Sequence, residues 1–378
     1  MILNRNFHIG SAHIFGLLLL LVSTDALAQN YTAQKTTDHG VPIVRLTDAA
    51  NGVVVSIVPS VGNRCYEMKV HGQNILYFPQ EADLSDYVKR PQLGGVPFMA
   101  PWADIIDEQA FWANGKRYGF NMSLGNVRGD HPAHGFLMTS PLWEVTEVAA
   151  DSQSAHVTSR LQFWKSPDMM AQWPFAQEYE MTYSLAGGVL EVRTTITNLS
   201  TDPMPIAIGY HTLYQIPGIP RDQWNAHIPA RTHVVADGVK LSTGEMRPTG
   251  LPAPLPLGGA SLPDAFTSAD AWRSAKGFAA ANPGITFDDG FADLERDADG
   301  RAHFWIESGG KKVEVMFGPK YLSATIWLPP GSPFIAFESL TAIIDGLNLQ
   351  RQGKYPALQM LPPGQKWTES FWIRASGI

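Results

Sequence analysis

The sequence predicts an all-β protein, a large antiparallel β-sandwich with few short helices. Short apolar segments rich in β-branched and aromatic residues recur along most of the chain, which is typical of strands. Gly and Pro interrupt these segments at short intervals, as turns between neighbouring strands require. Only residues 262–281 have a helix-like composition. Many strands joined by short turns pack most simply as two layers of sheet.

The clearest expected strands have β-branched or alternating side chains between Gly or Pro boundaries. They cover residues 53–59, 179–198 as a hairpin around Gly187-Gly188, 302–317 as a hairpin around residues 308–310, and then 321–328 and 334–338. Residues 217–263 are rich in Pro and Gly but include a β-like stretch at 232–235, so we interpret them as an excursion from the sandwich. No internal repeat is evident.

The N-terminus has the pattern of a secretory leader. Arg5 provides a positive charge, residues 14–22 are apolar but too few to span a bilayer, and residues 26–28 form an Ala-x-Ala cleavage site. We therefore expect residues 1–28 to be a signal peptide and residues 29–378 to form one β-sandwich domain. The mature protein is expected to be periplasmic or secreted, without a membrane association.

The composition argues against several classes of function. The formal net charge is -7, and the sequence has no cluster of Lys and Arg residues, so a nucleic-acid partner is not expected. Cys65, the single cysteine, cannot form an intrachain disulfide and is expected to be a small buried hydrophobic residue. The sequence does not indicate an oligomeric state.

Several motifs of cofactor and metal enzymes do not occur in the sequence. There is no GxGxxG opening a helix, no P-loop, no GxSxG elbow and no HExxH. His131 and His134 have a spacing that two metal ligands can adopt, but no second ligand cluster accompanies them, and His131 is more simply a surface-loop residue. We therefore predict neither a cofactor nor a metal.

Three polar residues within mostly apolar surroundings are the candidate catalytic groups: His134, His211 and Glu338. Each is expected near the end of a strand, and two imidazoles with a carboxylate can exchange protons near neutral pH. Taken alone, His211 is more simply a histidine at the edge of the core. Glu338 follows the apolar residues 335–337, where a carboxylate requires either an ion-pair partner or a function.

These residues lie in motifs that resemble those of the aldose 1-epimerase (galactose mutarotase) family, in the same order along most of the mature chain. The matching segments are Gly94-Gly95-Val96-Pro97, His134-Gly135, Gly209-x-His211-x-x-Tyr214, Leu241-Ser242-Thr243-Gly244-Glu245, Phe287-Asp288-Asp289-Gly290-Phe291, and Trp327-x-Pro329 with residues 337–341. Each segment is short, but six in the correct order are much more specific than any one alone.

The resemblance implies a β-supersandwich with an open sugar cleft and cofactor-free interconversion of the α and β anomers of a sugar. It implies that Glu338 is the general base and that His211, assisted by His134, protonates the ring oxygen. Asp288 would bind sugar hydroxyls. Among the tryptophans, Trp102, Trp305 and Trp327 could pack against a sugar ring, although aromatic residues in a sandwich more often belong to the core.

The chain departs from the family pattern at one position. Asp104 and Ile105 stand where the family usually has Asn and a sugar-binding Arg, which removes five directional donors. Asp104 is expected to accept hydrogen bonds from hydroxyls or to be a solvated loop charge. Two alternatives remain open: a non-catalytic carbohydrate-binding protein on the same scaffold, and a polysaccharide-cleaving enzyme using Glu338 and Asp288.

Overall fold

The computed structural model describes Met1 and residues 30–79, 83–123, 127–259 and 286–378. Strands predominate over helices in the described chain, and every pair of named strands is antiparallel, which confirms the predicted fold class. The expected helical segment at 262–281 and residues 2–28 of the expected leader lie outside the described residues.

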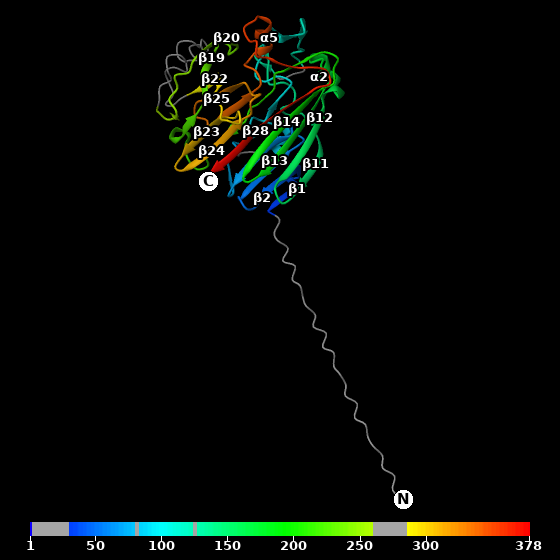
Figure 1. The fold of residues 1–378 in the computed structure, drawn as a ribbon, viewed down its shortest axis with the longest axis vertical. Helices are drawn as coiled ribbons and strands as arrows, with labels where there is room; N and C mark the ends of the chain where they lie inside the picture. Colours follow the sequence, from blue (N-terminus) through cyan, green and yellow to red (C-terminus); the bar gives the residue numbers. More distant parts are fainter. Residues whose placement is uncertain (2–29, 80–82, 124–126, 260–285) are drawn as a thin grey trace.

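A nine-stranded sheet extends across the molecule (Figure 1). Its strands, in spatial order, are β11 (Glu144–Ala150), β12 (Ala155–Gln162), β13 (Gln177–Ala186), β14 (Val189–Asn198), β28 (Lys366–Ser376), β24 (Lys311–Phe317), β23 (Ala302–Ser308), β18 (Asn225–His227) and β21 (Leu255–Pro256). The expected hairpins β13–β14 and β23–β24 are both present. Gly187 and Gly188 turn the first with φ of 56° and 75°, a backbone region that favours glycine.

An eight-stranded sheet contains the strands on which Asp288, Trp327 and Glu338 lie. Its strands are β20 (Ser242–Pro248), β19 (Ala230–Ala236), β22 (Phe287–Leu294), β25 (Ser323–Leu328), β26 (Ile335–Leu340), β16 (Gly209–Tyr210) and β6 (Phe98–Met99), with β17 (Leu213–Tyr214) also paired to β26. The expected strands at 321–328 and 334–338 correspond to β25 and β26.

Smaller sheets complete the fold. A five-stranded sheet consists of β1 (Tyr31–Asp38), β2 (Val41–Asp48), β3 (Val53–Val58), β4 (Arg64–Val70) and β5 (Gln73–Asn74). Two-stranded sheets are formed by β7 (Ala110–Ala113) with β8 (Lys116–Gly119), β9 (Val127–Arg128) with β10 (His131–Pro132), and β15 (Met204–Ile206) with β27 (Gln359–Leu361).

A continuous apolar core lies between the sheets. Along β13, buried residues alternate with more exposed ones, as one-sided packing of a strand requires. The ring centroids of Phe304 in β23 and Phe337 in β26 lie 5.6 Å apart. This contact joins the nine- and eight-stranded sheets. β1 contacts β11, which brings the five-stranded sheet against the other end of the large one. Cys65 is fully buried in this core, as predicted.

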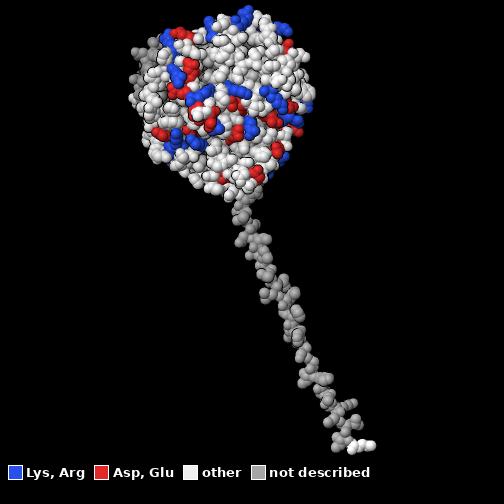
Figure 2. Space-filling model, viewed as in Figure 1, with Lys and Arg blue, Asp and Glu red and all other residues white. Residues whose placement is uncertain are grey.

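On the outer face of the large sheet, acidic and basic side chains are interleaved rather than separated into patches (Figure 2). Cross-strand ion pairs account for part of this pattern, for example Arg160 with Glu144 at 3.1 Å. Such exposed pairs contribute little to stability but keep the face polar.

Residues 217–259, the described part of the expected excursion at 217–263, differ from that expectation. They contribute β18 and β21 to one edge of the nine-stranded sheet and β19 and β20 to one edge of the eight-stranded sheet. The Pro and Gly residues separate short strands here instead of replacing them.

The described helices are α1 (Leu84–Lys89), α2 (Pro167–Gln172) and α5 (Gly346–Arg351), each six residues long. None of the helices in the described part of the chain combines the length and apolar character needed to cross a membrane.

Candidate active site

Glu338 lies in the interior of β26, not at a strand end as predicted. The apolar run at 335–337 suggested that the strand stops at Glu338, but pairing continues through Ser339 and Leu340. All six residues of β26 are buried, and the side chain of Glu338 is only 2% exposed. A carboxylate in this environment is costly unless it has a partner.

The partner of Glu338 is His211. β16 pairs with Leu340 and Ser339, β17 pairs with Ala336 and Ile335, and the two residues between β16 and β17 leave the ladder opposite Glu338. His211 follows β16 in this gap, where its backbone N–H donates to Pro97 at 2.9 Å. Its Nε2 lies 3.2 Å from Oε1 of Glu338, and its side chain is 6% exposed.

His134 reaches the same position from the loop after β10. Its backbone has φ of 59°, and its N–H donates to the carbonyl of Asp104 at 2.8 Å. Gly135 fixes this turn, because it has φ of 64° and a Cβ there would lie 2.1 Å from the carbonyl oxygen of Ala100. The rings of His134 and His211 meet edge to face, with centroids 5.6 Å apart.

A cavity of about 200 Å³ joins these side chains. All six predicted site residues line it, together with two that the sequence analysis missed: His134, His211, Glu338, Asp104, Asp288 and Trp327, with Leu93 and Arg128. The indole of Trp327 forms one wall, with its ring 5.3 Å from that of His211. The other tryptophans considered do not line the cavity, because Trp102 is buried in the core and Trp305 stacks on His227.

Asp288 lines the cavity and pairs with two cationic side chains. It lies on β22 directly opposite Trp327 of β25, so the sheet register presents both at the same position. Lys240 forms a close ion pair with its Oδ2, and Arg128 approaches the same oxygen at 3.5 Å. Neither cation was identified from the sequence. The only available signal was the missing family arginine, which left the site without a guanidinium group.

Burial changes the proton affinities of the three central groups. It raises the pKa of Glu338 well above its ordinary value, and Asp104 adds to this, whereas Arg128 and Lys240 oppose it. Burial lowers the pKa of His211 well below its ordinary value, with a further contribution from His134. Burial among protein atoms also lowers the pKa of His134, although Asp104 opposes the shift. Both members of the His211–Glu338 pair are thus driven towards their uncharged forms.

The buried atoms of the site leave capacity for a ligand. Nδ1 of His134, Nδ1 of His211 and Oε2 of Glu338 have no hydrogen-bond partner within the described structure. The residues that carry these atoms all line the cavity, so a ligand bound there can complete their hydrogen bonding. Among the described residues, no group of three or more His, Cys, Asp or Glu side chains is arranged to hold a metal.

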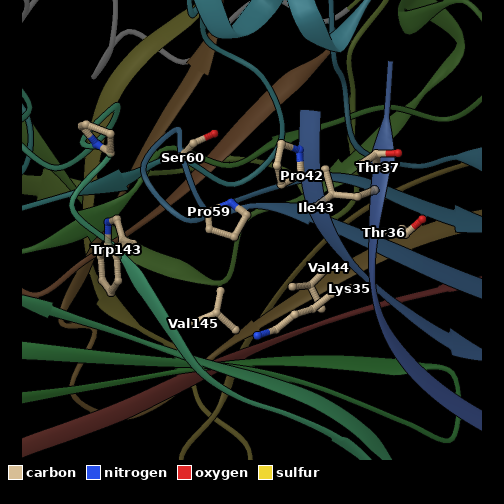
Figure 3. Close-up of a pocket in the computed structure, with 11 residues that line it drawn as sticks. Lys35, Thr36, Thr37, Pro42, Ile43, Val44, Pro59, Ser60, Trp143 and Val145 are labelled. Carbon is tan, nitrogen blue, oxygen red and sulfur yellow. The ribbon is translucent and has the colours of Figure 1, made fainter. Parts of the chain in front are cut away.

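A second, larger hollow lies elsewhere. It has a volume of about 590 Å³ and is a groove between β1, β2 and residues 141–145, and Figure 3 shows the side chains around it. Lys35 is the one titratable residue among those that line it. The groove has no acid–base pair, so the smaller cavity is the candidate active site.

The sequence as a whole matches the family model described as aldose 1-epimerase over residues 42–374. This match covers most of the chain, including every residue that lines the cavity. The chain belongs to the aldose 1-epimerase family. The segments quoted above for the resemblance all lie within this range, which confirms the family.

Solved structures of other aldose 1-epimerase family proteins have the same fold. A galactose mutarotase-like protein from Clostridium acetobutylicum is 21% identical, with a TM-score of 0.77 over 92% of this chain and 99% of that one. Galactose 1-epimerase from Lactobacillus acidophilus is 16% identical, with a TM-score of 0.69 over 92% and 99%. A putative aldose 1-epimerase from Escherichia coli is 16% identical, with a TM-score of 0.60 over 87% and 97%. At these identities the likeness shows the fold alone.

Proposed function

We propose that this protein is an aldose 1-epimerase that interconverts the α and β anomers of a free aldose by acid–base opening and closure of the ring. The observation that carries the proposal is the buried His211–Glu338 pair, 3.2 Å apart, at a cavity that also contains His134. Opening of a hemiacetal ring requires a base to remove one proton and an acid to deliver another, and this cavity contains both kinds of group.

The proposed reaction starts when the proton shared by the pair moves from Oε1 of Glu338 to Nε2 of His211, 3.2 Å away, and Glu338 then removes the proton from the anomeric hydroxyl. His211, with His134 beside it, gives a proton to the ring oxygen as the bond from C1 to that oxygen breaks. The open-chain aldehyde then rotates about the C1–C2 bond, and the ring recloses with the two groups exchanging roles. Each well-placed acid or base contributes about 10²–10⁴ in rate.

The direct test is polarimetry, or NMR of anomer exchange, with freshly dissolved α-glucose, α-galactose and a panel of other aldoses. We expect the protein to accelerate equilibration of at least one sugar above the rate in buffer. If calorimetry detects sugar binding but no aldose equilibrates faster, the protein is a carbohydrate-binding protein without catalysis. Shorter sugars released from an oligosaccharide would instead favour a polysaccharide-cleaving enzyme.

We predict that Glu338→Gln and His211→Ala each reduce kcat/KM for mutarotation by about 10²- to 10⁴-fold, because each removes one proton-transfer group. Glu338→Gln should melt no earlier than wild type at pH 7, since a neutral amide has nearly the shape of the uncharged carboxyl group that burial favours.

A matched control lies on the outer sheet face, where His156 and Glu147 form a similar pair at 3.5 Å. His156→Ala and Glu147→Gln should leave mutarotation unchanged. Retained activity in either site variant, or an equal loss in the control variants, would reject the assigned roles.

We also propose that the protein acts outside the cytoplasm. The proposal is supported by the leader pattern at residues 1–28.

A further inference from the structure

Arg128 is the site residue that the known motifs do not explain. It lies on β9, six residues before His134 in the sequence, and its side chain remains 44% exposed where it meets the cavity. Its charge reaches the whole site, because it lowers the pKa of both histidines and of Glu338. A guanidinium group therefore enters the cavity from a segment other than residues 104–105.

Asp288 does not need Arg128 for charge compensation. Lys240 already forms the closer ion pair with Asp288, and its side chain is nearly buried, at 8% exposure. Its backbone has φ of 76°, a strained conformation for a lysine that persists where the surrounding structure holds it. One guanidinium nitrogen of Arg128 lies 3.5 Å from the same oxygen, which is a long contact. The other N–H groups of the guanidinium group therefore remain able to donate to a ligand.

Arg128 and Asp288 therefore present a hydrogen-bond donor and an acceptor next to each other in the cavity. Within the described structure, both cation contacts of Asp288 engage Oδ2, and the side chain keeps 14% exposure. Oδ1 is left to accept from a ligand hydroxyl, while Arg128 can donate to the next one. Asp104 and Asp288 balance Arg128 and Lys240 in formal charge around the cavity, which favours an uncharged ligand over an anionic one.

We propose that Arg128 is a specificity-determining residue that, with Asp288, binds two neighbouring hydroxyls of a neutral aldose, and that Lys240 is a positioning residue for Asp288. This inference rests on the proposed function for its substrate class. It assigns to Arg128 the directional donors that Asp104 and Ile105 do not provide.

The test compares wild type with Arg128→Ala and Arg128→Lys on glucose, galactose and their 3-, 4- and 6-deoxy analogues. We expect Arg128→Ala to raise KM for the preferred sugar by about 10- to 100-fold, the effect of losing one hydrogen bond to a charged group. The deoxy analogue that lacks the bound hydroxyl should have a similar KM in both enzymes. Arg128→Lys should be intermediate, because an ammonium group lacks the fork.

Arg160→Ala is the matched control, since Arg160 also pairs with one carboxylate but lies on the outer sheet face. It should behave as wild type. A KM within twofold of wild type for every sugar with Arg128→Ala would overturn the proposal. So would a loss confined to kcat, which would mean that Arg128 acts only through the charge of the acid–base groups.

Two further results separate this inference from the proposed function. If wild type does not catalyse anomer exchange but binds sugars, the same fold-changes are expected in Kd by calorimetry, and their absence would overturn the inference. If wild type prefers glucuronate to glucose and Arg128→Ala abolishes that preference, the guanidinium binds a carboxylate, and the assignment to neutral hydroxyls is wrong. Failure of wild type to bind any sugar would also overturn it.

Discussion

Glu338 and His211 are shifted by burial in opposite directions, and both shifts favour the uncharged pair. A pair in contact at 3.2 Å titrates as a unit, so its two apparent pKa values belong to the pair rather than to either residue. The form that holds one titratable proton between the two side chains can give and accept a proton, whichever side chain carries it at rest. Gain of a second proton or loss of the last one should stop the reaction.

We predict a pH profile of kcat/KM with a plateau across neutral pH. The second proton must go to His211, whose pKa is lowered, so the midpoint of the acid limb should lie below 6.5. The last proton leaves Glu338, whose pKa is raised, so the alkaline midpoint should lie well above 4.5. Initial rates measured from pH 4 to 10 test this. An acid midpoint above 6.5 would contradict the shift assigned to His211.

At this scale the sequence predicted six residues of the cavity but missed Leu93 and Arg128, and it also missed Lys240, which pairs with Asp288. Glu338 was identified because a carboxylate is unusual beside the apolar residues 335–337, whereas the family resemblance pointed to Asp104, Asp288 and Trp327. Arg128 lies among polar loop residues, where a charged side chain is ordinary. Only the pairing of β9 with β10, beside His134, brings it to the site.

At the scale of elements, strands whose apolar and polar side chains alternate could be predicted from the sequence, whereas the residues at which strands end were harder to predict. The hairpins β13–β14 and β23–β24 follow from alternation around Gly-Gly turns. The position of Glu338 inside β26 did not follow, because the polarity of one residue does not show where backbone pairing stops. The expected β-like stretch at 232–235 lies within β19, but the other short strands, β18, β20 and β21, were hidden by the Pro and Gly residues between them.

We predict that Gly135→Ala both destabilises the protein and impairs the site. The new methyl group would meet the carbonyl of Ala100 at 2.1 Å, in a turn with φ of 64°. We expect a loss of about 2–4 kcal/mol in the free energy of unfolding, from backbone strain and the clash together. Denaturant unfolding and the mutarotation rate measure the two effects.

Gly115→Ala provides the control, because Gly115 has a similarly positive φ of 74° but no atom within 4 Å of the new Cβ. It should show the backbone cost alone, about 1 kcal/mol, with the activity unchanged. Equal effects of the two substitutions would show that the close approach to Ala100 does not matter.

At the scale of the whole molecule, the fold class was predictable but the order of strands was not. Local patterns indicate where strands form, whereas pairings such as β14 with β28 join residues far apart in the chain. The family resemblance supplied the architecture that periodicity alone could not.

Processing of the leader is a prediction about the whole chain. When the full sequence is expressed in a Gram-negative host, we expect a periplasmic protein whose first residue is Gln29. Intact-mass measurement of the fractionated protein tests this. Ala28→Arg should block cleavage, because the site requires a small residue. A cytoplasmic protein that retains residues 1–28 would contradict the export proposal.

The position of β28 has a consequence for how the chain matures. β28 bonds to β14 on one side and to β24 on the other, so it joins the two halves of the nine-stranded sheet. A ribosome must therefore release nearly the whole polypeptide before that sheet can close. A premature stop before residue 366 would expose two open strand edges, which recruit other chains into aggregates. Loss of β28 (Lys366–Ser376) should thus yield insoluble product rather than a slightly shortened enzyme.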